Sequence, residues 1–148
     1  MNTSQTLQQM QQLRLHGMYH AYRSQLELPM DQQLEGHDLV AHLLQSEDLN
    51  RTNEKTAYYL KLAKLRLPAT IEQVECSPAR NITKQQLASM IEGRYLQQGE
   101  NILVTGATGC GKSYLACALG HQACLQGYKT CYLNMNRLIE KVTLSKLD

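Results

Sequence analysis

Eight consecutive residues combine three glycines, a lysine and a serine in a spacing suited to phosphate binding. They are Gly106, Ala107, Thr108, Gly109, Cys110, Gly111, Lys112 and Ser113. They match GxxxxGK followed by Ser or Thr at every defined position. Glycines let a loop turn tightly and bring backbone N–H groups against an anion, because no side chain obstructs the approach. Lys112 would add a positive charge for the β and γ phosphates, and the Ser113 hydroxyl would bind Mg²⁺. We therefore predict a nucleotide-binding loop over these residues.

Such a loop needs a strand before it and a helix after it, and the sequence predicts both. NILVT (101–105) has three β-forming residues in five and predicts a short buried strand. SYLACALGHQACLQ (113–126) predicts a helix whose N-terminus carries a partial positive charge towards the anion. KTCYLNM (129–135) predicts a second strand, and a further helix begins with NRLIEKV (136–142). Strand, helix and strand in this order indicate an α/β fold with a parallel sheet.

The residues before the loop predict mostly helix. Apolar residues recur every three or four positions between Leu7 and Leu26, and two further helical stretches cover 37–49 and 53–67. Pro78 and Asn81 mark a joint, after which Thr83 and Gln86 fit a capping box that opens a helix over 84–92. We therefore divide the chain into a helical N-terminal domain, 1–79, and the N-terminal part of a phosphate-loop domain, 80–148.

A group of basic residues in the helical part has two interpretations. They are either a solvated helix face or contacts to nucleic-acid phosphates. The residues are Arg51, Lys55, Lys61, Lys64 and Arg66.

Composition limits the class of protein. Hydrophobic residues make up 43% and charged residues 19% of the 148 positions, which is typical of a globular chain. The net charge of +2 is too small to indicate a nucleic-acid or membrane partner by itself. No apolar run approaches the ~20 residues of a membrane span, and MNTSQTLQQM lacks the core of a signal peptide, so we expect a cytoplasmic protein without membrane contact. The five cysteines form no CxxC pair, so no zinc site is indicated; two of them fit one buried helix face.

From the loop outwards the sequence resembles the IstB-like ATP-binding proteins. These are helper ATPases of bacterial insertion sequences, related to the helicase loader DnaC and the initiator DnaA. The resemblance is carried by NILVTGATGCGKSYLACALGHQA (101–123), by GYKTCYLNMNRLIEKV (127–142) and by LRLHGMYHAY (13–22) with LLQSEDLNRTNEKTAYYLKLAKL (43–65). It implies an AAA+ fold, ATP and Mg²⁺ as cofactors, DNA and a transposase as partners, and self-assembly on DNA. Only the Walker A loop, Gly106 to Ser113, carries over residue by residue.

The resemblance also implies what this chain lacks. The Walker B acidic pair, the sensor residue and the arginine finger would lie beyond Asp148, and the carboxylates after Ser113 are Glu140 and Asp148. We therefore expect an incomplete AAA+ sheet, a fragment of a longer protein, and no ATP hydrolysis by this chain alone. Both neighbours of NILVT would come later in the family's sequences, so NILVT should be loosely held or pair with KTCYLNM.

Two other classes of protein remain open. One is another P-loop NTPase, such as a small kinase. A kinase usually carries this loop near its N-terminus, whereas here the loop begins only at Gly106. The other is a non-enzymatic helical interaction module with a vestigial loop.

Overall fold

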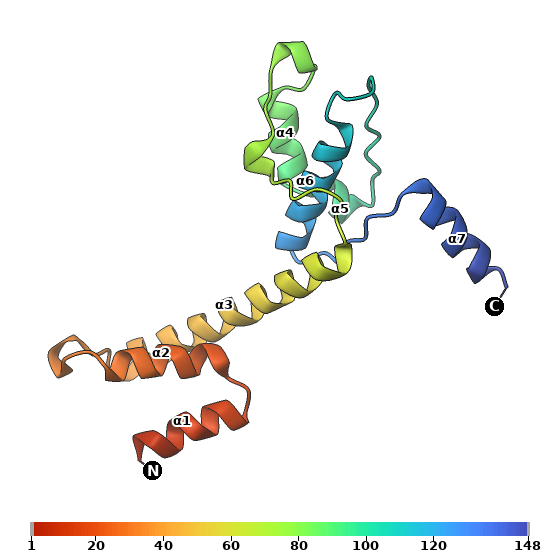
Figure 1. Ribbon diagram of the computed structural model, residues 1–148. Coiled ribbons are helices and arrows are strands. Elements are labelled where there is room, and N and C mark those ends of the chain that lie inside the picture. The colour runs from red at the N-terminus through yellow and green to blue at the C-terminus, as the bar shows by residue number, and fades with distance from the viewer. Residues whose placement is uncertain (1, 148) are drawn as a thin grey trace. The chain divides into compact units, whose positions relative to one another are not determined.

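The computed structural model describes residues 2–147 (Figure 1). These residues form two compact units. The first unit ends at Lys55 and the second begins at Thr56. Helices, turns and loops make up both units, and α3 (Gly36–Ala63) contributes residues to each of them. Across the described range, no helix is long and apolar enough to span a membrane.

The first unit contains α1 (Thr3–Gln12), α2 (His16–Leu26), the short 3-10 helix η1 (Met30–Gln32) and the first part of α3. Asn2 and Gln5 form a capping box at the start of α1. The helices expected over 37–49 and 53–67 form one continuous helix, α3, which ends at Ala63, so the expectation of helix over 64–67 is wrong. No proline or glycine separates them in the sequence, so nothing in the backbone stops the helix between them.

Helices α2 and α3 meet at Gly17, where a buried carboxylate replaces a local cap. The N-cap of α2 is Leu15, which has no capping side chain, but Glu47 of α3 accepts a hydrogen bond from the Met18 N–H at 3.1 Å. Glu47 also accepts one from Arg51 Nε at 2.8 Å, and its side chain is only 9% exposed. A Cβ on Gly17 would lie against the Ser46 carbonyl oxygen and 2.6 Å from Glu47 Cα. The contact therefore requires glycine at this position.

Opposing effects act on the pKa of Glu47. Burial raises it, but hydrogen bonds from Arg51 and the N–H groups of Met18 and Gly17, with the charge of Arg51, lower it, and the net pKa lies below the ordinary 4.5. A lowered carboxyl pKa means that the folded state favours the ionised form. The stabilisation by Glu47 is therefore complete above pH 4.5 and is lost as the pH falls through the folded-state pKa.

Replacing Gly17 by alanine tests the close packing at this position, because packing and helix propensity predict opposite changes in stability. Propensity alone would make Gly17→Ala stabilising, by up to about 1 kcal/mol. We expect destabilisation by about 1–2 kcal/mol instead, because the new methyl group meets backbone atoms that cannot move aside cheaply. Urea unfolding followed by circular dichroism measures the change. The exposed Ser24→Ala in the same helix is the control, and a Gly17→Ala chain as stable as the parent would contradict the close approach.

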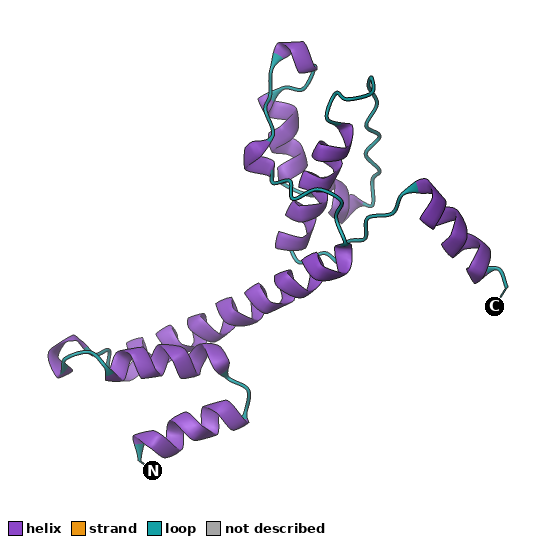
Figure 2. Cartoon of the chain, in the orientation of Figure 1, coloured by secondary structure: helices purple, strands orange, loops and turns teal. Residues whose placement is uncertain are grey.

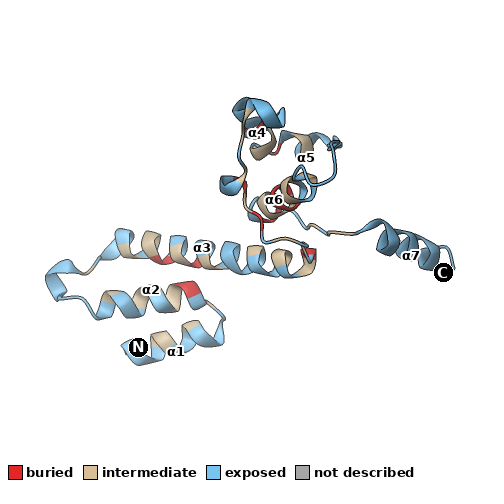
Figure 3. Ribbon diagram, turned by 45° about the horizontal axis from the view of Figure 1, so that its top comes forward, coloured by how far each residue is buried: buried red, intermediate tan, exposed pale blue. Residues whose placement is uncertain are grey.

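The second unit is organised around α6 (Lys112–Leu125). It also contains the end of α3, the 3-10 helices η2 (Ile71–Gln73) and η3 (Pro78–Arg80), and the helices α4 (Lys84–Ile91), α5 (Arg94–Gln98) and α7 (Met135–Ser145). The core cluster is formed by Ala69, Ile71, Leu87, Cys117, Ala118 and Leu119. Cys117 and Cys124 are fully buried, as expected for small apolar residues on one helix face. Figure 3 shows buried positions along α6. The capping box of Thr83 and Gln86 is confirmed by reciprocal hydrogen bonds of 3.0 and 3.1 Å.

The expected α/β fold with a parallel sheet is wrong for residues 2–147, none of which forms a strand (Figure 2). Residues 101–105 lie in a loop, and Leu103 is 88% exposed, so NILVT is neither a strand nor buried. KTCYLNM does not pair with it either: the Tyr132 N–H donates to the Ala63 carbonyl oxygen at the end of α3, at 2.8 Å. A strand needs a partner backbone to satisfy its N–H and C=O groups, whereas a helix satisfies them within its own segment. The β-forming residues of NILVT and KTCYLNM are therefore not sufficient to form strands without partner backbones.

The predicted division into a domain over 1–79 and a domain over 80–148 stays a prediction.

Candidate functional site

The predicted phosphate loop lies directly before α6. Gly111 is the N-cap of that helix, and the Cys110 N–H donates to the Ala107 carbonyl oxygen at 3.3 Å, which closes a tight turn. Gly109 and Gly111 have φ angles of 80° and 93°, in the left-handed region that side chains disfavour. Residues 106–111 thus form a loop with a tight turn that leads into α6, and Lys112 and Ser113 are the first residues of that helix.

The three glycines of the loop are needed for two different reasons. A Cβ on Gly106 would lie 2.6 Å from the Cys110 sulfur, so this glycine provides room for the neighbouring side chain. A Cβ on Gly109 or Gly111 would meet only open space, so these two are needed for their positive φ angles.

Several backbone donors of the loop and of the first turn of α6 have no acceptor. The first N–H groups of a helix cannot bond within it. Among the hydrogen bonds of residues 2–147, none uses the N–H groups of Gly109, Gly111, Lys112, Ser113 or Tyr114. The helix dipole adds about half a positive charge at the same place. The loop is therefore a ready site for an anion.

Lys112 folds back over the loop. Its Nζ donates hydrogen bonds to the carbonyl oxygens of Gly106 at 2.5 Å and Ala107 at 3.0 Å. The positive charge thus stands within the turn itself, next to the backbone donors without acceptors. Ser113 follows in the first turn of α6 with an exposed hydroxyl.

A cleft of about 1060 Å³ opens beside the loop, within the second unit. Cys110, Gly111 and Lys112 line one end of it. Another wall comes from residues 73–90, which offer amide, hydroxyl, apolar and charged side chains: Gln73, Val74, Glu75, Arg80, Asn81, Ile82, Thr83, Gln85, Gln86, Ser89 and Met90. A hydrogen bond links this wall to α6: the Tyr114 hydroxyl donates to Gln73 Oε1 at 2.7 Å. Sequence reasoning missed this wall, since the packing of η2 and α4 on α6 brings it to the loop.

Carboxylates are scarce around the loop. Within the described part after Ser113 there is Glu140, which is exposed on α7 and does not line the cleft, whereas Asp148 lies outside the described residues. Glu75 lines the cleft, but it is 81% exposed and paired with Arg80 at 3.7 Å. Nowhere in residues 2–147 do three or more His, Cys, Asp or Glu side chains gather as a metal site.

The basic residues singled out in the sequence are not equivalent. Arg51 is held by Glu47 in the first unit. Lys61, Lys64 and Arg66 are exposed in the second unit and take part in none of the ion pairs of the described chain.

Comparison with known proteins gives a consistent result. The family model described as IstB-like ATP binding protein matches residues 8–148. An ATP-binding protein of insertion sequence IS1162 from Pseudomonas fluorescens is 38% identical over 149 residues, which cover 100% of this chain and 64% of that protein. Two insertion-sequence ATP-binding proteins of Sinorhizobium fredii are 35% and 32% identical; the matches cover 93% and 97% of this chain and 55% and 58% of theirs. The chain therefore spans less than two thirds of the length of these relatives.

Proposed function

Because the chain belongs to the family of IstB-like ATP-binding proteins, we propose that it binds ATP with Mg²⁺ through residues 106–113, as a helper in DNA transposition. The observation that carries this proposal is the loop itself. Backbone N–H groups without acceptors, two glycines at positive φ and a lysine charge meet at the N-terminus of α6. This set of donors suits a polyphosphate.

Each loop residue has a role in this proposal. The N–H groups of Gly109, Gly111 and the first turn of α6 donate to phosphate oxygens. Lys112 exchanges the carbonyl oxygens of Gly106 and Ala107 for phosphate oxygens, which bind its charge more strongly. The Ser113 hydroxyl is a ligand for Mg²⁺, which the phosphates also hold.

The cleft beside the loop is the place for the nucleoside. Lys112 lines it, and its other lining residues include apolar and amide side chains, the mixture that fits a base with ring faces and polar edges. The lining amides that would hydrogen-bond the base are Gln73, Asn81, Gln85 and Gln86. Gln73 and Gln86 would do so through Nε2, because their Oε1 atoms already accept hydrogen bonds from Tyr114 and Thr83.

The partners that fit this role are target DNA and the transposase of the same insertion sequence, with self-assembly of the longer protein on DNA, in the cytoplasm. This proposal is supported by the names of the relatives, which are ATP-binding proteins of insertion sequences.

Alkylation of Cys110 tests the site without any requirement for catalysis. With limiting N-ethylmaleimide, Cys110 and Cys131 should react because they are exposed, whereas Cys117 and Cys124 should not because they are buried. ATP with Mg²⁺ should protect Cys110 and leave Cys131 unchanged as the internal control, measured by mass spectrometry of the peptides.

Two outcomes of the same assay would contradict the proposal. One is an unchanged rate at Cys110 under saturating ATP, and the other is faster reaction at Cys117 than at Cys110. Inorganic tripolyphosphate, which has no nucleoside, distinguishes binding at the loop from binding in the cleft. If the cleft holds the nucleoside, tripolyphosphate should protect Cys110 only at higher concentrations than ATP.

A further inference from the structure

Two segments far apart in the sequence lie side by side in the second unit. The Tyr132 N–H donates to the Ala63 carbonyl oxygen at 2.8 Å. A Cβ built on Gly120 of α6 would lie 3.0 Å from the side chain of Leu65 and 3.6 Å from that of Thr130. Leu65 and Thr130 therefore both pack on α6 at the same place, and the chain around residue 65 adjoins the chain around residue 130.

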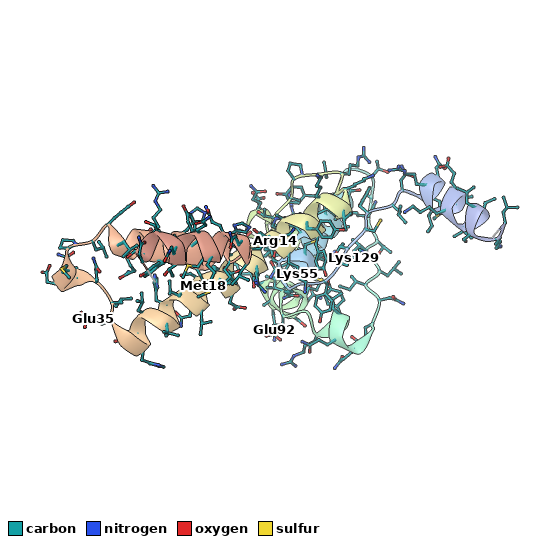
Figure 4. All side chains as sticks on the ribbon, turned by 90° about the horizontal axis from the view of Figure 1, so that it is seen from below. Arg14, Met18, Glu35, Lys55, Glu92 and Lys129 are labelled. Carbon is teal, nitrogen blue, oxygen red and sulfur yellow. The ribbon has the colours of Figure 1, made fainter. Side chains whose placement is uncertain are left out.

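The side chains next to these inward-facing residues are cationic and exposed. Lys64 and Arg66 flank Leu65, and Lys129 precedes Thr130 (Figure 4 labels Lys129). Lys61 lies one turn earlier on α3 and is also exposed. Residues 56–70 and 121–135 together contain these four cations and no acidic residue. None of the four takes part in an ion pair of the described residues.

The backbone at Lys64 is unusual for a lysine. Its φ is 49°, in the left-handed region, directly after the last residue of α3. Glycine is the common residue at such a helix end because it adopts this conformation without strain. A strained residue that persists at the surface is a reason to look for a functional role of its side chain.

We propose that Lys61, Lys64, Arg66 and Lys129, here called the basic surface, bind the phosphate backbone of double-stranded DNA. The proposal rests on DNA being a partner, as in the proposed function. It differs from the basic group singled out in the sequence in three ways. It excludes Arg51, which Glu47 engages, and Lys55, which belongs to the first unit. It includes Lys129, which the packing against α6 brings to the end of α3. An acid-free group of unpaired cations suits the regular charge of a duplex, and such contacts carry no sequence preference.

The test is DNA binding by the full chain at several salt concentrations, with a fluorescent duplex of arbitrary sequence. Lys64→Gln with Lys129→Gln should lower the salt slope by about 2 and the affinity at 0.1 M salt by about tenfold per lysine. The charge-matched control is Lys84→Gln with Lys141→Gln, which removes two exposed lysines elsewhere and should leave both quantities near those of the parent.

The variant Lys64→Gly distinguishes two possible roles of Lys64, one in binding DNA and one in stabilising the end of α3. It removes the charge and also relieves the positive φ, so the variant should be at least as stable as the parent in urea and should still lose about tenfold in DNA affinity. If Lys64 serves only to offset the dipole of α3, the variant should lose stability and keep its DNA affinity, and the proposal is overturned.

The remaining outcomes distinguish this proposal from the nucleotide site. If the parent binds DNA and the variants bind it equally, the basic surface is wrong while DNA remains a partner. If the parent binds no DNA while ATP still protects Cys110, the DNA partner is wrong and the nucleotide site stands. Stronger binding to an RNA duplex of the same sequence would overturn the assignment to DNA.

Discussion

The purified 148-residue chain, mixed with ATP and Mg²⁺, is expected to release no phosphate above a protein-free control. Phosphoryl transfer needs a positioned water, a metal held from both sides and a positive charge at the γ-phosphate. In the proposed site, Lys112 and Ser113 would supply only one side of such an arrangement. Glu140 lies on α7 outside the cleft, and Glu75 and Arg80 are exposed and paired with each other. An arginine finger alone contributes ~10³–10⁵ to the rate in GTPases, so the expected loss is large.

A colorimetric phosphate assay over several hours measures this. Phosphate release that disappears in Lys112→Ala would contradict the expectation. In that event Glu75→Gln identifies the source: loss of activity in this variant would make Glu75 the residue that orients the water. Unchanged activity would place the catalytic group elsewhere.

Lys112→Ala should weaken ATP binding by roughly 10- to 100-fold. A hydrogen bond to a charged group contributes ~1.5–3 kcal/mol, which corresponds to this range of affinity. Equilibrium dialysis with labelled ATP measures it directly, whereas intrinsic tryptophan fluorescence cannot, because the chain contains no tryptophan.

The control for this variant is Lys141→Ala on α7, which removes an exposed lysine that does not line the cleft. It should bind ATP as the parent does. Since Lys112 also bonds two carbonyl oxygens of the loop, the circular dichroism of both variants should be compared. Equal affinities for Lys112→Ala and the parent would remove the assigned role of the lysine.

The geometry of the loop was predictable because its determinants are local. Gly109 and Gly111 are needed for their own φ angles, and Gly106 makes room for a residue four positions later. The start of α4 was predictable for the same reason, since Thr83 and Gln86 satisfy each other's backbone groups. That residues 106–113 bind a nucleotide stays a prediction, tested by the experiments above.

The features that sequence reasoning missed depend on distant segments. A strand at 101–105 needs partner backbones, and no pattern within five residues says whether they are present. Glu47 caps α2 from another helix, 29 positions from Met18, so no capping motif near α2 revealed it. The cleft wall at 73–90 and the position of Lys129 beside the end of α3 likewise follow from packing on α6.

The most direct test of the central claim, that the loop binds the nucleotide through its backbone N–H groups, is a two-dimensional NMR spectrum of the chain with ¹⁵N-labelled glycine. The chain has nine glycines, so its amide signals can be assigned by single substitutions. On addition of ATP with Mg²⁺, the signals of Gly106, Gly109 and Gly111 should shift strongly, whereas those of Gly17 and Gly36 in the first unit should stay in place. Unchanged loop signals at saturating ATP, or shifts confined to Gly17 and Gly36, would contradict the account.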